Sequence, residues 1–351
     1  MKNIDKNTFL DIDLKAIGKN YKIIKKRVNN NCVVAATVKA DAYGLGVEMV
    51  VPKIIKSGCR YFFVATTNEA IELRNISKKI SIFILNGLVT NEINKIQKYN
   101  LIPVINNLEQ LAKIEKYQTL KKINLNIALH FDTGMSRLGL DKYETNHLIK
   151  NQKKLIKKSY ISLVMSHLAC ADDRHSKFNA IQLKRFLKII EFFPKAMHSL
   201  SNSAGTLLGK KYHFDMVRPG ISLYGGHCRK NEGKIYNNVI SLRAKLIQIR
   251  EIYKDDTIGY GATFRAKSKM KIGTLALGYA DGFNRKFSNN YHIYFKNNKV
   301  KIVGRVSMDL ITINLTNIKI NKNVGSNQFD IISDKNSVNS IAKLINTIPY
   351  E

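Results

Sequence analysis

The sequence predicts an α/β protein, a (β/α)8 TIM-type barrel followed by an all-β domain, and three observations support this fold class. The length of 351 residues exceeds what one hydrophobic core usually fills, which favours two domains. Short apolar runs alternate with amphipathic stretches along the first part of the chain, as in consecutive βα units. After about Gly233, short strand-like runs separated by Gly, Asn and Asp turns replace this alternation.

The first part of the chain favours a closed barrel. Asp13 can cap a helix that runs to about Val28, and residues 32–38 form a continuous apolar run typical of a strand buried on both faces. Eight such strands favour a barrel over an open doubly wound sheet, but no sequence rule decides closure. We expect the other strands at residues 61–65, 82–85, 102–105, 125–130, 161–166, 197–200 and 216–223, and helices at 47–56, 68–75 and 180–193.

The second part of the chain predicts a β-domain. We assign residues 11–233 to the barrel and residues 234–351 to the β-domain, with residues 1–10 joining the latter. The polar, glycine-containing segment 229–234 marks the boundary between them. We expect strands at residues 239–250, 271–277, 292–295, 299–303 and 310–315, and a helix at 338–345.

Composition excludes several classes of function. The formal net charge of +32 at pH 7 raises the possibility of a nucleic-acid partner, but the lysines are dispersed along the chain, which favours solvated helix faces over a binding patch. No apolar run is long enough to cross a membrane, and residues 1–13 lack the apolar centre of a secretory signal. Four scattered cysteines without metal-ligand spacing predict no metal site and favour the cytoplasm.

Lys39 is the first candidate for chemistry. It ends the apolar run at residues 32–38, where burial would lower its pKa and expose a nucleophilic amine. Position alone favours the plainer interpretation of a lysine that reaches solvent as the strand ends. The ends of the other expected strands change this balance, because in a barrel they form one rim. They supply His130, Asp132, Gly134, Arg137, His167, Asn202, Ser203, Gly205, Arg218 and Gly220.

This rim suits a phosphate-bearing ligand. Backbone N–H groups near glycine can hold phosphate, and Ser203 can add a hydroxyl donor. Taken singly, His167 is typical of a hydrogen-bonded core histidine and Ser203 of a turn residue. Taken together, these residues favour an anionic cofactor.

Eight ordered motifs resemble those of one enzyme family, the bacterial alanine racemases. The resemblance covers nearly the whole chain, and this many motifs in the same order make it highly specific. The segment at residues 36–46, Ala-Thr-Val-Lys-Ala-Asp-Ala-Tyr-Gly-Leu-Gly, resembles the cofactor-attachment motif. The other motifs lie at residues 132–139, 166–167 with 171–172, 202–204, 216–221, 259–263, 278–282 and 304–309.

The resemblance implies a two-base reaction on pyridoxal 5'-phosphate. Lys39 would form the Schiff base with the cofactor and act as one base at the substrate Cα. Tyr260, contributed by the other subunit of a homodimer, would be the opposing base. Two bases on opposite faces are what racemisation requires, since one removes the Cα proton and the other returns it on the far side. The implied product, D-alanine, serves peptidoglycan synthesis.

The resemblance also implies roles for the other rim residues. Arg218 would face the pyridine nitrogen and, as a permanent cation, keep it unprotonated. His167 would bridge Arg218 and Tyr260. The implied phosphate ligands are Tyr43, Ser203, Gly220, Ile221 and Tyr350. Arg137 and Met308, the latter from the partner, would bind the substrate carboxylate. Tyr279, Asp172, Arg285 and Arg305 would line the access corridor, although Asp172 is as typical of a helix cap.

The chain departs from the family pattern at three places. His130 stands where relatives carry a lysine, often carbamylated, that orients the arginine at position 137. We therefore expect a chloride, a water or another carboxylate to orient Arg137. Ser307 replaces a common cysteine, which should have a mild effect. The chain stops at Glu351 while relatives continue, which would leave Tyr350 weakly anchored.

Other functions remain open at this stage. A racemase that accepts serine or a broader range of amino acids is the nearest alternative, because one sequence does not fix the size of the pocket. A pyridoxal-phosphate-binding homeostasis protein would lack the β-domain and with it Tyr260. A related decarboxylase would use a partner cysteine and a glycine-rich phosphate loop that we do not find here. The net charge is the only feature of the sequence that favours a nucleic-acid-binding protein.

Overall fold

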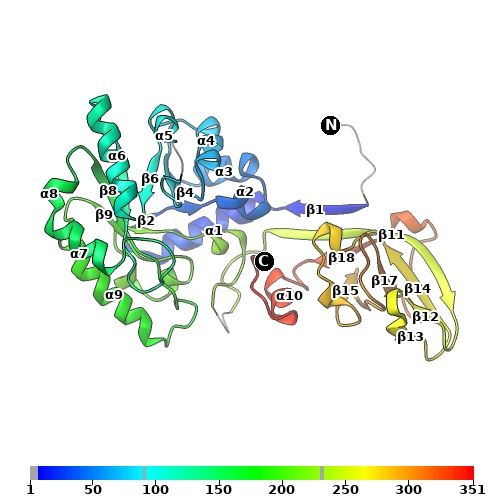
Figure 1. Cartoon of the computed structure of the whole chain (residues 1–351). Coiled ribbons are helices and arrows are strands. Elements are labelled where there is room, and N and C mark those ends of the chain that lie inside the picture. Colours follow the sequence, from blue (N-terminus) through cyan, green and yellow to red (C-terminus); the bar gives the residue numbers. More distant parts are fainter. Residues whose placement is uncertain (1–6, 90–91, 230–232) are drawn as a thin grey trace. The chain divides into compact units, whose positions relative to one another are not determined.

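A computed structural model describes residues 7–89, 92–229 and 233–351 and divides the chain into two compact units. One unit is Leu14–Asn237, and the other joins the described residues up to Asp13 with Asn238–Glu351. Of the segment 229–234, in which we expected the domain boundary, residues 230–232 lie outside the described part. Figure 1 shows the first unit in blue to green and the second chiefly in yellow to red.

The first unit is a barrel of parallel strands. A sheet runs in the order β3-β4-β5-β6-β7-β8-β9, and β10 pairs with β2. Backbone bonds close the circle, because Ala35 donates to Val217 and Arg218 donates to Ser201. These strands are β2 (Val33–Val34), β3 (Ala36–Thr37), β4 (Tyr61–Val64), β5 (Ser81–Ile84), β6 (Ile102–Ile105), β7 (Asn126–His130), β8 (Tyr160–Met165), β9 (Met197–Ser199) and β10 (Met216–Val217).

Side chains from all around the barrel fill its interior. Ala35, Phe63, Phe83, Leu163 and Met216 belong to one buried cluster, and they come from strands on every side of the circle. A barrel packed in this way has a solid centre that admits no ligand, and active sites of such barrels lie at the carboxyl ends of the strands. The prediction of a (β/α)8 barrel is confirmed.

Helices surround these strands (Figure 1). Their starts follow local sequence, since Thr66 and Glu69 form a capping box at α4, and Asp141 and Glu144 form another at α7. The helices are α1 (Leu14–Arg27), α3 (Val47–Lys56), α4 (Thr67–Ile76), α5 (Ile93–Lys98), α6 (Leu108–Lys121), α7 (Lys142–Lys150), α8 (Gln152–Leu155) and α9 (Lys177–Ile190). Short 3-10 helices lie at η1 (Gly205–Leu207), η2 (Lys210–Tyr212) and η3 (Ile221–Tyr224).

One expected strand is wrong over most of its length. We expected a strand over residues 216–223, but it ends at Val217, and Ile221–Tyr224 form the 3-10 helix η3. The reason is local, because Pro219 cannot donate to a sheet and Gly220 adopts a conformation outside the strand region. The break turns the chain across the rim of the barrel.

The second unit is an antiparallel β-domain. Its sheet follows the order β16-β15-β18-β11-β14-β17, and β1 pairs with β11, so the N-terminal strand joins this domain. Phe295, Phe329 and Ile313 lie in its buried core. Its elements are β1 (Thr8–Ile12), β11 (Ile240–Ile252), β12 (Thr257–Ile258), β13 (Phe264–Arg265), β14 (Met270–Leu275), β15 (His292–Phe295), β16 (Asn298–Lys301), β17 (Ile311–Asn314), β18 (Gln328–Ile332) and α10 (Val338–Leu344), with 3-10 helices η4 (Tyr260–Ala262), η5 (Tyr279–Asp281), η6 (Arg285–Phe287) and η7 (Val324–Ser326).

Within the described ranges, no helix combines the length and the apolar character that crossing a membrane requires.

Candidate active site

The chain turns sharply at Lys39, where strand β3 ends. Residues 40–43 all have positive φ, between 52° and 59°, so the element labelled α2 (Lys39–Gly44) is a left-handed turn. Such a conformation costs roughly 1–2 kcal/mol per non-glycine residue, so contacts from elsewhere must stabilise it. Lys39 itself is partly buried at the start of this turn.

Two carboxylates hold the turn in place. Glu69 Oε1 accepts a hydrogen bond from the Ala40 N–H at 2.9 Å, while Glu69 Oε2 accepts from the Ala65 N–H at 2.6 Å. Asp41 Oδ1 accepts from the Val47 N–H at 2.7 Å. We did not single out Glu69 from the sequence, although its place in a Thr-x-x-Glu capping box was a visible signal.

The left-handed turn brings the Tyr43 side chain over the 220–224 segment. The Tyr43 ring packs against Tyr224 with centroids 4.8 Å apart. Its hydroxyl lies so near Gly220 that a Cβ atom there would stand 2.1 Å from it. Gly220 is therefore needed for a close approach, not for an unusual φ.

Ser203 connects β9 to the same segment. Its Oγ is buried and accepts hydrogen bonds from the Gly220 N–H at 2.9 Å and the Ser222 N–H at 3.4 Å. Tyr43, Ser203, Gly220 and Ile221 are thus gathered at the end of the barrel where β3, β9 and β10 terminate. Hydroxyl and backbone N–H donors at one place suit a phosphate group.

Arg218 is a buried cation at the centre of this rim, only 4% exposed. Its guanidinium donates to Ser199 Oγ and, at 2.6 Å, to the Ser166 carbonyl, and it lies 5.8 Å from the Phe63 ring centroid. Burial lowers the Arg218 pKa to about 9. No carboxylate of the described chain forms an ion pair with it, so no ionic partner compensates its positive charge.

His167 links Arg218 to Asn202. Its Nδ1 lies 3.5 Å from Arg218 Nη2, and its Nε2 lies 3.2 Å from Asn202 Nδ2. Burial, followed by the nearby Arg218 charge, holds the pKa of His167 well below its ordinary value. His167 is therefore neutral. The contact between His167 and Arg218 is present, and the bridge from His167 to Tyr260 stays a prediction.

His130 is neutral and its tautomer is fixed. Asn106 Nδ2 donates to the carbonyls of Leu85 and Val104, so its Oδ1 must face His130 Nδ1, 2.8 Å away. His130 Nδ1 therefore carries the proton. Burial, then the Arg218 charge, lowers the His130 pKa to about 3. Arg137 is exposed beyond it.

The β-domain gathers the other candidate residues on one exposed face. The Tyr279 N–H donates to the Ser307 carbonyl at 3.0 Å, and the Ala280 N–H donates to Met308 at 2.7 Å. The Arg305 guanidinium lies close to Gly261, next to Tyr260. The exposed fractions are 72% for Tyr260, 43% for Tyr279 and 58% for Met308. These three side chains are therefore accessible from outside the β-domain.

Comparisons with known proteins agree with this arrangement. Residues 12–228 match the model of the alanine racemase N-terminal domain, and residues 239–351 match that of the alanine racemase C-terminal domain. The chain belongs to the alanine racemase family. The alanine racemase of Rickettsia rickettsii is 39% identical over 343 residues, 97% of this chain and 94% of the relative. That of Rickettsia bellii is 40% identical over 323 residues, 92% of this chain and 78% of the relative.

Solved structures of the same family share the fold. The alanine racemase of Bartonella henselae, solved with covalently bound pyridoxal phosphate, has a TM-score of 0.93 at 32% identity and covers 98% of this chain and 96% of its own. The biosynthetic alanine racemase of Pseudomonas aeruginosa has a TM-score of 0.89 at 31% identity, covering 99% and 96%.

Some residues expected at the alanine racemase site belong to the other compact unit of the chain. Tyr260, Met308, Tyr350 and the corridor residues Tyr279, Arg285 and Arg305 belong to the β-domain unit, whereas Lys39 and the rim belong to the barrel unit. Tyr350 is 51% exposed, beyond helix α10. Asp172 is exposed in the β8–α9 connection. The roles of these residues remain predictions.

Proposed function

We propose that this chain is a pyridoxal-phosphate-dependent alanine racemase, an isomerase that interconverts L-alanine and D-alanine in the cytoplasm and supplies D-alanine for peptidoglycan. One observation carries the proposal: a buried, uncompensated Arg218 and a cluster of phosphate-type donors share the barrel rim with Lys39. Relatives over 97% of the chain are named alanine racemases, and the Bartonella structure holds covalently bound pyridoxal phosphate.

The residues present fit this cofactor. Ser203, Tyr43 and the backbone N–H groups of Gly220 and Ile221 would hold the phosphate, with Tyr350 as a further ligand. The Gly220 N–H would then exchange its hydrogen bond to Ser203 Oγ for one to the phosphate. The absence of a side chain at Gly220 leaves room for the Tyr43 hydroxyl beside the phosphate donors. The aldehyde carbon of the cofactor would attach to Lys39, and its ring nitrogen would face the buried guanidinium.

The chemistry divides between the cofactor and the protein. When bound, pyridoxal phosphate accepts the negative charge that develops at the substrate Cα. Lys39 would remove or return the Cα proton on one face, and Tyr260 would do so on the other. Arg218 would donate a hydrogen bond without giving up its proton, because a guanidinium held by Ser166 and Ser199 remains charged near neutral pH. Neutral His167 would fix the orientation of Arg218.

The substrate carboxylate would bind Arg137 and Met308. His130 is neutral, so it supplies no negative charge to orient Arg137. We therefore propose that a chloride, a water or another carboxylate orients that guanidinium. A high-resolution density map of the holoenzyme tests this, since a map without an anion, an ordered water or a carboxylate near Arg137 would rule it out.

A homodimer would complete the site. Tyr260 and Met308 are exposed on the β-domain, where each could enter the barrel mouth of a partner chain. Alanine as substrate, and the absence of nucleic-acid and membrane partners, are part of the same proposal. A pyridoxal-phosphate homeostasis protein is disfavoured, because residues 239–351 match the C-terminal domain of the family. Serine or a broader range of amino acids remains the main alternative for the substrate.

A direct assay tests the function. The purified protein should show the visible absorbance of lysine-bound pyridoxal phosphate and convert L-alanine to D-alanine. Lys39→Ala should abolish the absorbance of the bound adduct. Faster turnover of serine than of alanine would indicate the broader racemase, and a bound cofactor without turnover of either amino acid would contradict the proposal.

A further inference from the structure

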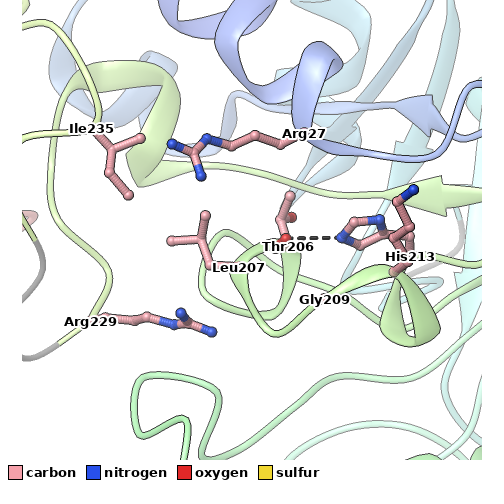
Figure 2. Close-up of a pocket in the computed structure, with 8 residues that line it drawn as sticks. Arg27, Thr206, Leu207, Gly209, His213, Arg229 and Ile235 are labelled. Carbon is pink, nitrogen blue, oxygen red and sulfur yellow. Dashed lines mark hydrogen bonds between the residues drawn. The ribbon is translucent and has the colours of Figure 1, made fainter.

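A hollow of about 250 Å³ lies outside the barrel, away from the Lys39 rim (Figure 2). Arg27, at the end of helix α1, lines it together with His213, which comes shortly before strand β10. Both residues precede their strands, whereas Lys39 follows the end of β3 and Gly220 follows that of β10. The hollow is thus separate from the candidate active site and lies toward the opposite end of the barrel.

Positive charge dominates the walls of the hollow. Arg27, Lys210 and Arg229 line it, and no aspartate or glutamate of the described residues does. Figure 2 shows the guanidinium groups of Arg27 and Arg229 reaching toward the same space from two sides. Within the described chain neither arginine forms an ion pair. This arrangement differs from the dispersed surface lysines, because arginines from separate elements converge on one concavity.

Arg229 carries the strongest sign of a missing ligand. Its Nε and Nη2 atoms are excluded from solvent and find no hydrogen-bond acceptor among the described residues. Buried charged donors without acceptors are costly, so native proteins provide an acceptor from the chain, from water or from a ligand. A rotation of the side chain that turns these nitrogens into the hollow would let an oxyanion accept from both, since the guanidinium fork matches two oxygens of a phosphate.

The other walls complete the recognition surface. Leu207 and Ile235 contribute apolar side chains beside the cations. His213 is tied into the wall, because its Nε2 donates to the Thr206 carbonyl at 2.9 Å. A water takes roughly 30 Å³ in the liquid, so the hollow can hold a tetrahedral oxyanion with a small organic group or several waters.

We propose that this hollow binds a phosphate group, free or as a phosphomonoester, through Arg27, Lys210 and Arg229. In a monoester, the organic part would contact Leu207 and Ile235. The site is distinct from the donors at Ser203 and Gly220, so a chain loaded with its cofactor would still take up a second phosphate.

Calorimetric titration of the holoenzyme tests the proposal. In the holoenzyme the rim is filled, so added inorganic phosphate or phenyl phosphate reports on other sites. Titrations at constant ionic strength with chloride separate specific binding from general screening. We expect one binding event that Arg229→Gln weakens at least about tenfold, because charge-assisted hydrogen bonds are lost. Lys211→Gln, an exposed neighbour of Lys210 outside the lining, should leave binding unchanged.

The two probes distinguish the sources of the phosphate. Tighter binding of phenyl phosphate than of inorganic phosphate indicates a monoester, and the reverse order indicates free phosphate. Arg27→Gln provides a second variant if Arg229→Gln does not fold, as judged by circular dichroism and the cofactor absorbance. The proposal is overturned if wild-type holoenzyme binds neither probe, or if binding survives unchanged in the folded arginine variant.

Discussion

The Tyr43 hydroxyl oxygen lies in the space that any side chain at position 220 would need. A Cβ atom at Gly220 would stand 2.1 Å from this oxygen and 2.9 Å from Tyr43 Cζ, closer than such atoms pack in proteins. Tyr43 and Gly220 come from opposite ends of the barrel sequence, and both are proposed ligands of the cofactor phosphate. Their contact makes a specific prediction possible.

Gly220→Ala should weaken cofactor binding while leaving the barrel folded. The new methyl group would displace the Tyr43 hydroxyl, and overpacking of this kind typically costs about 1–3 kcal/mol. We expect the Kd for pyridoxal phosphate to rise at least about tenfold. Gly233→Ala is the matched control, because nothing lies within 4 Å of a Cβ there. Equal cofactor affinity in the two variants, measured by absorbance titration, would disprove the assignment of Gly220.

The left-handed turn after Lys39 predicts that a glycine at position 40 stabilises the folded chain. Ala40 has φ 52° and ψ 54°, and it is exposed, so Ala40→Gly removes strain without leaving a cavity. Relief of about 1–2 kcal/mol outweighs the roughly 0.4–1 kcal/mol by which glycine favours the unfolded chain. Urea unfolding of the cofactor-free protein should therefore show a gain of roughly 0.5–1 kcal/mol.

At a position with right-handed helical backbone, an alanine-to-glycine substitution should instead lower the stability. Ala180 is an exposed alanine within helix α9, so Ala180→Gly should lower the free energy of unfolding by about 1 kcal/mol. A loss of stability at both positions would show that the backbone at Ala40 is not left-handed.

Buried neutral histidines predict a loss of stability in mild acid. The His130 pKa is about 3 in the folded chain because of burial and then the Arg218 charge, against about 6.5 when unfolded. Above pH 6.5 both states bind no proton at this group, and the stabilisation is complete. Between pH 6.5 and 3 only the unfolded state takes up the proton, so stability falls as the pH falls. At pH 5 the loss from His130 is about 2 kcal/mol.

Measurements of the free energy of unfolding at pH 7 and pH 5 test whether stability falls with pH. His130→Gln removes the titration, so its loss of stability between the two pH values should be smaller than that of the wild type. His147→Gln replaces an exposed histidine and should behave as the wild type does. An unchanged pH dependence in His130→Gln would show that the His130 pKa is the same in the folded and unfolded chain, which contradicts the account.

Much of the barrel was predictable from the sequence because its strands are continuous apolar runs. In the barrel, strand 102–105 and helix 47–56 were predicted with the bounds that the structure shows, and in the β-domain strand 292–295 likewise. Strand β18 was missed, since Gln328–Ile332 is a short alternating segment in a polar stretch. Such a strand depends on pairing with β11, a contact that local pattern does not reveal.

The candidate site was predictable in its residues but not in its geometry. The order of motifs indicated Lys39, Ser203 and Arg218, and the fold brings them to one rim. The left-handed turn at residues 40–43 could not be predicted, because no local propensity favours it in alanine or tyrosine. It depends on Glu69, which is distant in sequence and supplies the acceptor for the Ala40 N–H.

A mixed dimer tests the central claim, that Lys39 of one chain works with Tyr260 of its partner. A dimer of one Lys39→Ala chain and one Tyr260→Phe chain, isolated through two affinity tags, would contain one intact site if the residues pair across subunits. It should then recover about half of the wild-type activity, because one of the two sites of a symmetric dimer is whole. A dimer of the wild-type chain with a chain carrying both substitutions should be inactive.

The reverse outcome, an inactive mixed dimer of the single variants and about half of the wild-type activity in the dimer with the double variant, would show that Lys39 and Tyr260 act within one chain and would contradict the account.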